Sequence, residues 1–494
     1  MSDSLLVVDV GTSGVRAAIV RPDAAVEHVH HVPVLPKTPA PGLVEIDAAA
    51  IADAVLDVAT RALADGGPVG GVGIANQRAS TVVWERTTGR PVAPGIGWQD
   101  LRTLITCLTL QADGFHFAPN ASATKAAAIL DDVDPERARA AAELCIGTID
   151  SWVAWTLSGG ATGGRLHVTD ATNAAVTGLV EIDPLRWDAR ALDALRIPAA
   201  CLPEIVDSSG ALGRADALRG APAICAIAGD QQASLIGQGC TRPGLAKVTF
   251  GTGGSLNMCT GTGVPTTLGR NAGGTFPIVA WRRAGVSTFG VEGIILSAGT
   301  CIEWLRDDLG LISSSEDSAT VAAACADTGG VWFVPAQLGL ATPVWDFGAR
   351  GTLLGLTRGT GRPEIVRAVL EGLAARGCDL LEAAEADGGL RPDALRLDGG
   401  MSANEVFVRA LAEAVGRPVE VSATREATTL GAGFLAGLAT GTWRDEADVA
   451  AAYRPAATVE PAATETERAA RRAKWLEARH RAEKLIPELS TITF

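Results

Sequence analysis

The chain lacks the sequence features of several large protein classes. No apolar run approaches the roughly eighteen residues that a membrane-spanning helix needs, so we expect no membrane insertion. The N-terminus has no basic region followed by an apolar stretch, which argues against a signal peptide. The nine cysteines form no CxxC pair, and Cys145, Cys225 and Cys301 lie in apolar surroundings, where buried reduced thiols are the rule. We therefore predict a cytoplasmic protein.

Positive charge is also scarce. The 42 lysines and arginines are outnumbered by 56 aspartates and glutamates, which gives a net charge of -14. Nucleic-acid binding needs a basic surface, so we expect no nucleic-acid partner. A nucleotide remains compatible with this charge, because Mg²⁺ and backbone N–H groups can meet its phosphates.

Several familiar site motifs are missing as well. No stretch fits the Walker pattern GxxxxGK(S/T), and no GxGxxG leads from a strand into a helix, which argues against both of those nucleotide-binding folds. His28, His30 and His31 lie in an alternating, strand-like stretch without further ligands at zinc-site spacing. The run 208–210 (Ser-Ser-Gly) is not the GxSxG elbow of a hydrolase. We predict neither a zinc site nor a serine hydrolase.

What the sequence does contain is one strand-turn-strand pattern twice. An apolar segment at 5–16 is broken by Gly-Thr-Ser at 11–13, and the segment 248–255 is broken by Gly-Thr-Gly at 251–253. Glycines in such turns let backbone N–H groups approach phosphate oxygens closely. The repeat predicts two similar halves that face one cleft, an arrangement that suits ATP and a small acceptor.

Strands alternate with helices along the rest of the chain, which predicts an α/β fold with sheets covered on both faces. The expected helices are 47–65, 135–158, 362–385, 404–415 and a charged, solvated tail at 463–485. The expected strands are 69–75, 80–85, 222–228, 246–250, 255–259, 331–334 and 395–397, with a loop at 205–215. We place a boundary near Gly239, between domains 1–239 and 240–494.

Two aspartates follow buried strands. Asp9 ends the strand before the first turn, and burying its carboxylate is costly without a cation or hydrogen bonds. A position near Mg²⁺ would supply the cation. The alternative is that Asp9 is a turn residue whose carboxylate accepts from its own backbone. Asp230 follows the strand 222–228, at the strand end where α/β folds bind ligands. It could accept a proton from a hydroxyl that attacks phosphorus, and it could also cap the next helix. These two roles of Asp230 are compatible.

Other polar groups stand at strand ends or turns. Arg78 and Trp98 offer a clamp for a polyol, because the guanidinium can meet oxygens and the indole can meet C–H faces. A core position is the ordinary alternative for Trp98. Asp398, with the glycines after it, could cradle an adenine or ribose near a helix start, and an ordinary strand-to-helix turn is the alternative.

In their order, these motifs resemble the FGGY carbohydrate kinases, and most closely the glycerol kinases, over nearly the whole chain. The matching segments are 73–78, 98–100, 122–125, 167–173, 229–232, 250–253, 345–346, 349–351, 355–359 and 398–400. The resemblance implies a two-domain, actin-like ATPase (ribonuclease H-like) fold with a central ATP and substrate cleft. It implies transfer of a phosphoryl group from ATP to a terminal hydroxyl of a small polyol or sugar.

The resemblance also implies roles for particular residues. Asp230 corresponds to the catalytic base, and Asp9 to the Mg²⁺-associated carboxylate. The implied ATP contacts are Thr12, Ser13, Arg16, Thr252, Gly299, Glu303, Gly400 and Asn404; glycerol kinases usually have glutamine at the position of Glu303. The implied acceptor contacts are Arg78, Ala79, Trp98, Asn120, Asp230, Gln231 and Ser255. The formation of homo-oligomers is left open.

Three acceptor positions depart from the usual glycerol kinase pattern. Ala79 replaces a glutamate, Asn120 a tyrosine and Ser255 a phenylalanine. An unpaired hydroxyl or an ill-filled pocket can cost roughly one to several kcal/mol, about tenfold or more in selectivity. One hypothesis is therefore a kinase for a larger polyol or ketose of the erythritol, xylulose or ribulose type, and the other is drift among glycerol kinases.

A non-catalytic sugar sensor on the same fold is the rival from another functional class. Such a protein would bind its ligand without phosphorylating it. The presence of both Asp9 and Asp230 argues against this reading, because a sensor need not keep either carboxylate.

Overall fold

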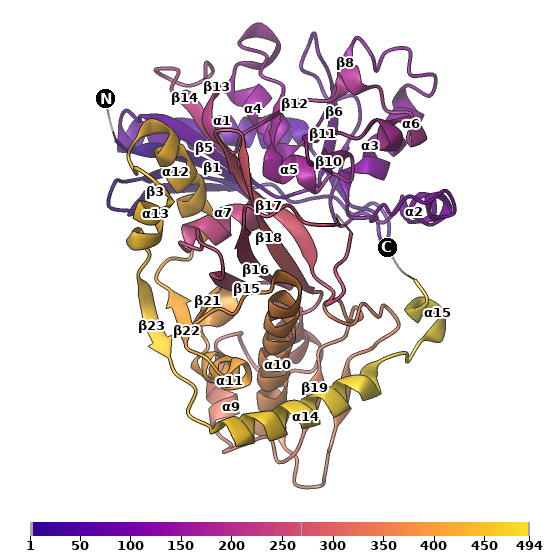
Figure 1. The fold of residues 1–494 in the computed structure, drawn as a ribbon, viewed down its shortest axis with the longest axis vertical. Helices are drawn as coiled ribbons and strands as arrows, with labels where there is room; N and C mark the ends of the chain where they lie inside the picture. The colour runs from indigo at the N-terminus through magenta and orange to yellow at the C-terminus, as the bar shows by residue number, and fades with distance from the viewer. Residues whose placement is uncertain (1–2, 268, 493–494) are drawn as a thin grey trace.

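One large sheet connects the two halves of the molecule. The computed structural model describes residues 3–267 and 269–492. Within these residues, a 13-stranded sheet has the order β23-β22-β21-β15-β16-β18-β17-β13-β14-β5-β1-β2-β3. Figure 1 shows the sheet passing from an upper half, built by the start of the chain, into a lower half built by later residues.

The first half supplies one end of this sheet. Its strands are β1 (Leu5–Val10), β2 (Gly14–Val20), β3 (Val26–Pro33), β5 (Gly71–Asn76), β13 (Ser209–Arg214) and β14 (Ala223–Gly229). A separate four-stranded sheet consists of β4 (Glu45–Ile46), β7 (Gly95–Ile96), β6 (Thr81–Glu85) and β8 (Leu144–Thr148). Two small pairs are β10 (Val180–Ile182) with β11 (Leu185–Trp187), and β9 (Val168–Asp170) with β12 (Glu204–Val206).

The second half supplies the other end. Its strands are β15 (Ala246–Phe250), β16 (Gly254–Gly261), β17 (Phe276–Arg283), β18 (Val286–Ile295), β21 (Leu395–Asp398), β22 (Val419–Ser422) and β23 (Pro455–Val459). A small pair is formed by β19 (Trp332–Val334) and β20 (Thr352–Leu354).

The same strand arrangement occurs in both halves. In the first, β3, β2 and β1 form an antiparallel meander, and β5 and β14 continue the sheet in parallel. In the second, β15, β16 and β18 form the corresponding antiparallel part, with β17 between β16 and β18 in the chain, and β21 and β22 continue in parallel. Each Gly-Thr turn joins the first two strands of its half. The predicted duplication, and with it the two-domain α/β fold of the actin-like type, is confirmed.

Helices cover the faces of the sheet. In the first half they are α1 (Ala48–Gly66), α2 (Leu104–Gln111), α3 (Ser122–Val133), α4 (Ile149–Leu157), α5 (Ala171–Ala175), α6 (Ala189–Ala194) and α7 (Asp230–Gly237). Later ones are α8 (Gly299–Glu303), α9 (Asp317–Ala323), α10 (Arg362–Gly388), α11 (Glu405–Val415), α12 (Ala427–Thr440), α13 (Glu446–Ala452), α14 (Glu465–Ala482) and α15 (Pro487–Ser490). Asp47 caps α1 by accepting from the Ala50 N–H, and Ile51, Val55 and Val58 are buried on its inner face.

Helix α12 belongs to the later part of the chain but packs on the first half. It lies against α7, β14 and β5, and shares an apolar core with β1. The approach of α7 and α12 needs glycine on both helices. A Cβ on Gly431 would come within 1.8 Å of the Ala233 carbonyl oxygen, and one on Gly237 within 1.9 Å of the Ala427 oxygen. This contact fixes α7, which begins at Asp230.

Two expectations from the sequence are wrong. The segment 135–158 is not one helix, because 144–148 forms β8 and pairs with β6 before α4 begins. The segment 205–215 is not a loop, because 209–214 forms β13, which lies between β14 and β17. Strand β8 pairs with β6, about 60 residues earlier, and β13 pairs with the next strand β14 and with the more distant β17, so local spacing alone does not reveal the full pairing.

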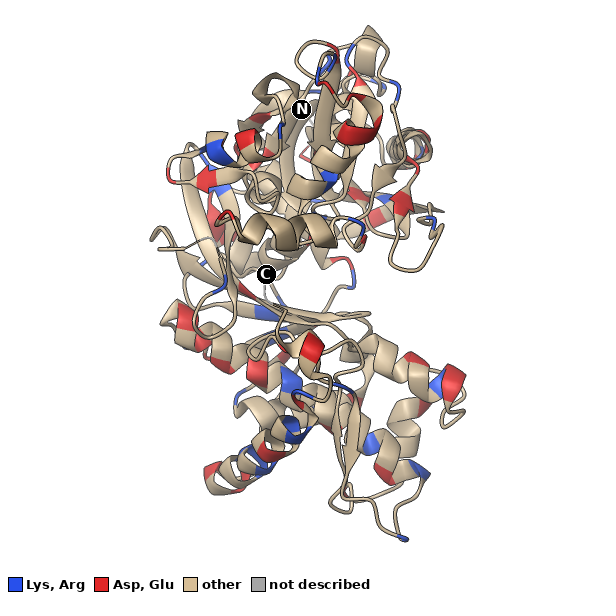
Figure 2. Ribbon diagram, turned by 90° about the vertical axis from the view of Figure 1, so that its right-hand side faces the viewer, with Lys and Arg blue, Asp and Glu red and all other residues tan. Residues whose placement is uncertain are grey.

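The charged tail forms α14, which is only partly solvated. Trp475, Ala478 and Ala482 are buried, and Arg472 and Arg479 pair with the buried Asp379 of α10. The sequence expectation of a helix is confirmed, but one of its faces is packed. Elsewhere, acidic and basic residues are interspersed over both halves (Figure 2). Among the described residues, no helix is both long and apolar enough to cross a membrane.

Candidate active site

Asp9 lies just before the first Gly-Thr turn, at residues 11–13. Asp9 lies near the end of β1, and no described residue donates a hydrogen bond to its carboxylate. Burial, reinforced by the negative charge of Asp230, raises the pKa of Asp9 to about 7, although Arg16 opposes the shift. A carboxylate in this state is stabilised by an added cation. Asp9 therefore fits a Mg²⁺-associated role, with the remaining ligands coming from phosphates and water.

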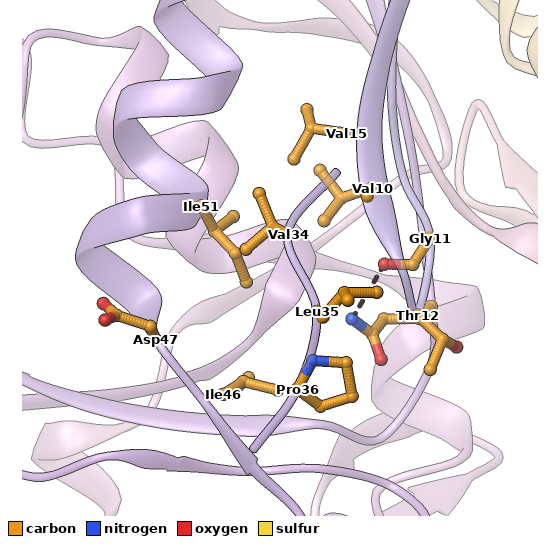
Figure 3. Close-up of a pocket in the computed structure, with 12 residues that line it drawn as sticks. Val10, Gly11, Thr12, Val15, Val34, Leu35, Pro36, Ile46, Asp47 and Ile51 are labelled. Carbon is orange, nitrogen blue, oxygen red and sulfur yellow. Dashed lines mark hydrogen bonds between the residues drawn. The ribbon is translucent and has the colours of Figure 1, made fainter. Parts of the chain in front are cut away.

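Hydrogen bonds to Gly11 stabilise the first Gly-Thr turn. The Gly11 N–H donates to the Gly14 carbonyl at 2.9 Å, and Gln77 Nε2 donates to the Gly11 carbonyl at 3.1 Å. A small pocket lies beside this turn, lined largely by apolar side chains such as Val10, Val34 and Ile51 (Figure 3). Its apolar lining does not suit triphosphate, so we assign it to the support of the turn rather than to ligand binding.

Arg16 anchors the turn to the helix that covers α7. Its Nη1 lies 2.5 Å from Glu426 Oε2, at the residue before α12. On the opposite side, Trp98 Nε1 donates to Thr12 Oγ1 at 3.2 Å. Because Thr12 is a predicted phosphate contact and Trp98 a predicted acceptor contact, the structure brings the two predicted subsites together. Ser13 is exposed in the turn.

Asp230 opens α7 at the end of β14. Its Oδ1 accepts from the Gln231 N–H at 2.8 Å and lies 3.5 Å from Arg78 Nε. Gly229 makes this approach possible, because a Cβ there would stand 2.8 Å from the Arg78 side chain. Burial raises the pKa of Asp230, and the positive charge of Arg78 opposes the rise. A carboxylate with a raised pKa and spare acceptor capacity is suited to take up a proton.

The second half contributes Glu292 to the same cluster. Arg78 donates to it twice, from Nη1 at 3.0 Å and from Nη2 at 2.8 Å. Ser255 Oγ donates to Glu292 Oε1 at 3.0 Å. Ser255 is thereby adjacent to Arg78, as predicted for two acceptor positions. Its hydroxyl is already bonded to protein.

Gln231 is joined to a buried lysine. Lys247 Nζ donates to Gln231 Oε1 and to Thr249 Oγ1, both at 2.8 Å. Burial lowers the pKa of Lys247, and the charges of Asp398 and Glu292 oppose the shift. Asp398 ends β21 and accepts from Ser234 of α7 and from Gln238 just after it, so α7 is bonded to both halves.

Ala79, Trp98 and Asn120 form one wall. Lys125 Nζ donates to the carbonyls of Trp98 and Asn120, each at 3.0 Å. Ser122 Oγ donates to the Ala79 carbonyl at 3.0 Å. The side chain of Trp98 is 38% exposed and Asn120 is exposed, so both are available to a ligand. Ala79 is buried at a positive φ of 62°.

The predicted nucleotide positions of the second half lie around the other turn. The N–H groups of Gly299 and Thr300 donate to the carbonyls of Gly251 and Thr252. A Cβ on Gly299 would stand 2.7 Å from the Gly251 oxygen, which explains why this position is glycine. Glu303 is exposed at the end of α8, the helix that Gly299 begins.

Gly400 and Asn404 stand further along, between β21 and α11. A Cβ on Gly400 would meet nothing within 4 Å, so the backbone there is open. Asn404 caps α11 by accepting from the Phe407 N–H at 3.1 Å, and its Nδ2 donates to Ser318. Their contact with a nucleotide stays a prediction.

A further buried network supports the strand ends that carry Arg78 and Asp230. The Asn173 and Asn76 amides pair reciprocally, at 2.8 and 3.0 Å, just before Gln77. Thr172 Oγ1 accepts from the Gly229 N–H at 2.9 Å, just before Asp230. Asp170 receives hydrogen bonds from both Thr172 and Asn173. The motif 167–173 therefore stabilises the strand ends that carry Arg78 and Asp230.

The sequence of this chain is similar to a family of known proteins. The sequence matches the N-terminal domain of the FGGY family of carbohydrate kinases over residues 4–237 and the C-terminal domain over residues 246–440. The chain belongs to the FGGY family of carbohydrate kinases. It is accordingly an ATP-dependent carbohydrate or polyol kinase.

Similar proteins of known sequence or structure match nearly the whole length of the chain. A glycerol kinase of Aromatoleum aromaticum is 43% identical over 97% of this chain and 98% of its own. A Plasmodium falciparum glycerol kinase with ADP has a TM-score of 0.89 and 27% identity, with 99% of each chain covered. A xylulose kinase from Rhodospirillum rubrum shares the fold at a TM-score of 0.80 and 22% identity, over 97% of this chain and 100% of its own.

Sequence reasoning missed Glu292, Lys247 and Glu426. Glu292 is the most informative of these, because it is the main partner of Arg78. One signal was available. The apolar segments on either side of Ala284-Gly285 form a hairpin pattern, and a glutamate inside the second segment needs a buried partner.

Proposed function

We propose that this FGGY kinase transfers the γ-phosphoryl group of ATP to a terminal hydroxyl of glycerol. The observation that carries the proposal is the placement of Asp230 at the start of α7, with Arg78 and Gln231 beside it and Asp9 near enough for the charge of Asp230 to raise the pKa of Asp9. The 43% identical relative named above is a glycerol kinase. Both points support a small polyol as the acceptor.

In this proposal Asp230 orients the hydroxyl and accepts its proton while the oxygen attacks phosphorus. Arg78 binds a second hydroxyl, and the indole of Trp98 packs on the C–H face of the acceptor. Backbone N–H groups of the two Gly-Thr turns bind the phosphates. Mg²⁺ near Asp9 would neutralise phosphate charge.

A four- or five-carbon acceptor is the second candidate. Ala79, Asn120 and Ser255 have smaller or more polar side chains than the usual glycerol kinase residues at these positions. The xylulose kinase with the same fold supports the idea that this architecture accommodates other acceptors.

The test is ADP release by the purified protein with Mg-ATP and glycerol, erythritol, xylitol, ribulose or xylulose. A preference for glycerol supports the first candidate, and a preference for a longer acceptor supports the second. Absence of turnover with all five contradicts both and favours a sugar-binding sensor.

A further inference from the structure

The ion pair between Arg78 and Glu292 joins the two halves at the acceptor site. Arg78 follows β5 of the first half, and Glu292 lies within β18 of the second. The pair is bidentate, and the side chain of Glu292 is 6% exposed. Two parallel bonds fix the plane of a guanidinium as well as its position. The orientation of Arg78 therefore depends on a residue of the other half.

Arg78 also has a second carboxylate within reach. Its Nε lies 3.5 Å from Asp230 Oδ1, too far for a good hydrogen bond but close enough for attraction. Without Glu292, the guanidinium would be drawn onto Asp230. A base engaged in a close ion pair is a weaker proton acceptor, and an arginine engaged in this way no longer faces the acceptor.

We propose that Glu292 is a positioning residue that holds Arg78 for acceptor binding and keeps its guanidinium off Asp230. The inference rests on the proposed function, because it takes Arg78 as an acceptor contact and Asp230 as the base. Ser255 has a supporting role, since its hydroxyl donates to the Glu292 oxygen that also accepts from Arg78 Nη2.

The charges around the pair agree with this role. Burial raises the pKa of Glu292, but the charge and hydrogen bonds of Arg78 outweigh it and leave this pKa below its usual value. The pKa of Arg78 is raised, because Glu292 and Asp230 outweigh the effect of burial. Both partners are therefore charged at neutral pH. The other charged groups that influence this cluster are Lys247 and Asp9.

The test compares Glu292→Gln with wild type in steady-state kinetics, using the acceptor that wild type prefers. We expect the acceptor KM to rise about tenfold while the ATP KM stays within about twofold, because only the acceptor subsite loses its orientation. Glu292→Asp keeps the charge on a shorter side chain, so its acceptor KM should lie in between. If Glu292→Gln fails to fold, the kinetics of Glu292→Asp provide the test. Glu446→Gln is the matched control, because it breaks the remote Arg283–Glu446 pair.

A double-mutant cycle gives the second measurement. If Glu292 acts through Arg78, the acceptor KM of Arg78→Lys combined with Glu292→Gln should be close to that of Arg78→Lys alone. Effects that multiply would overturn the proposal. So would a lower Tm in Glu292→Gln with both KM values unchanged, because that result indicates a structural role only.

Wild-type activity separates this inference from the proposed function. Turnover by wild type, together with an unaltered acceptor KM in a folded Glu292→Gln, contradicts the positioning role alone. Absence of wild-type turnover with every acceptor contradicts the roles given to Arg78 and Asp230, and the positioning role with them.

Discussion

Two aspartates of this kinase lie beside arginine, and their carboxylates have very different numbers of partners. Asp379 of α10 is fully buried, and the side chains that pair with it or donate to it are those of Arg376, Arg472, Trp475 and Arg479. Burial alone would raise the pKa of Asp379, but the arginines hold it below its usual value. Its partners come from α10 itself and from α14, so the cluster fastens the tail of the chain to the second half.

Asp230 has far fewer partners. One backbone N–H donates to it, Arg78 stays 3.5 Å away, and its pKa is raised by burial. The nearby guanidinium is directed to Glu292 instead. A carboxylate with saturated oxygens stabilises the fold, whereas one with free acceptor capacity is available for chemistry. This difference separates structural from functional ion clusters in the molecule.

The largest effect is expected for Asp230→Asn. Loss of a general base lowers turnover by about 10²- to 10⁴-fold. Stability should be equal or higher, because an amide costs less to desolvate than a half-buried, poorly satisfied carboxylate. The measurements are kcat, ATP binding by calorimetry and the free energy of unfolding. Turnover near the wild-type rate would remove Asp230 from the mechanism.

Asp379→Asn should show the reverse pattern. Breaking a buried ion cluster from one side costs about 3–5 kcal/mol, because the arginines keep an uncompensated charge. The KM for both substrates should not change. Urea unfolding provides the stability, with Asp448→Asn as the control. That variant breaks an exposed pair with Arg444, so its loss of stability should be small. Equal losses of unfolding free energy in the two variants would contradict a stabilising role of the buried Asp379 cluster.

The buried Lys125 makes the stability of the fold depend on pH. Burial lowers the pKa of Lys125 to about 7, with partial compensation from Asp100. The unfolded chain therefore holds a proton that the folded chain lacks between about pH 7 and 10, so stability rises with pH in this window, and the full cost of burial is present below it.

The matched variant is Lys125→Met, which cannot titrate. Relative to it, wild type should gain on the order of a few kcal/mol of unfolding free energy between about pH 7 and 10. Other titrating groups cancel in the difference. Urea unfolding of both proteins across this range is the measurement, and parallel pH curves would contradict the lowered pKa.

Local sequence patterns were enough to find the strand-end carboxylates. Asp9 ends an apolar run two residues before Gly11, and Asp230 follows an apolar run and Gly229; in the structure Asp9 lies near the end of β1 and Asp230 directly follows β14. The duplicated turn likewise predicted the two halves, because each copy joins two consecutive strands. These features are encoded within a few residues of each other.

What sequence patterns could not reveal depends on distant pairing. Arg78 was assigned to the acceptor without its partner, because Glu292 lies 214 positions later on a strand of the other half. The Ser-Ser-Gly at 208–210 is typical of a turn and favours a loop at 205–215, whereas the place of β13 in the sheet depends on the distant strand β17 as well as on the adjacent β14. Residue identity shows that a charge needs a partner, but the tertiary fold decides which one.

The smallest predicted effect concerns Ser255, whose hydroxyl donates to Glu292. Ser255→Ala removes one hydrogen bond from Glu292 and leaves both bonds to Arg78, so the acceptor KM should rise about two- to fivefold with the ATP KM unchanged. Ser313→Ala is the control, because it removes a similar hydroxyl-to-carboxylate bond on the surface. If Ser255→Ala instead matched Glu292→Gln in full, the hydroxyl would have to bind the acceptor directly, and the cluster would recognise substrate through serine as well as arginine.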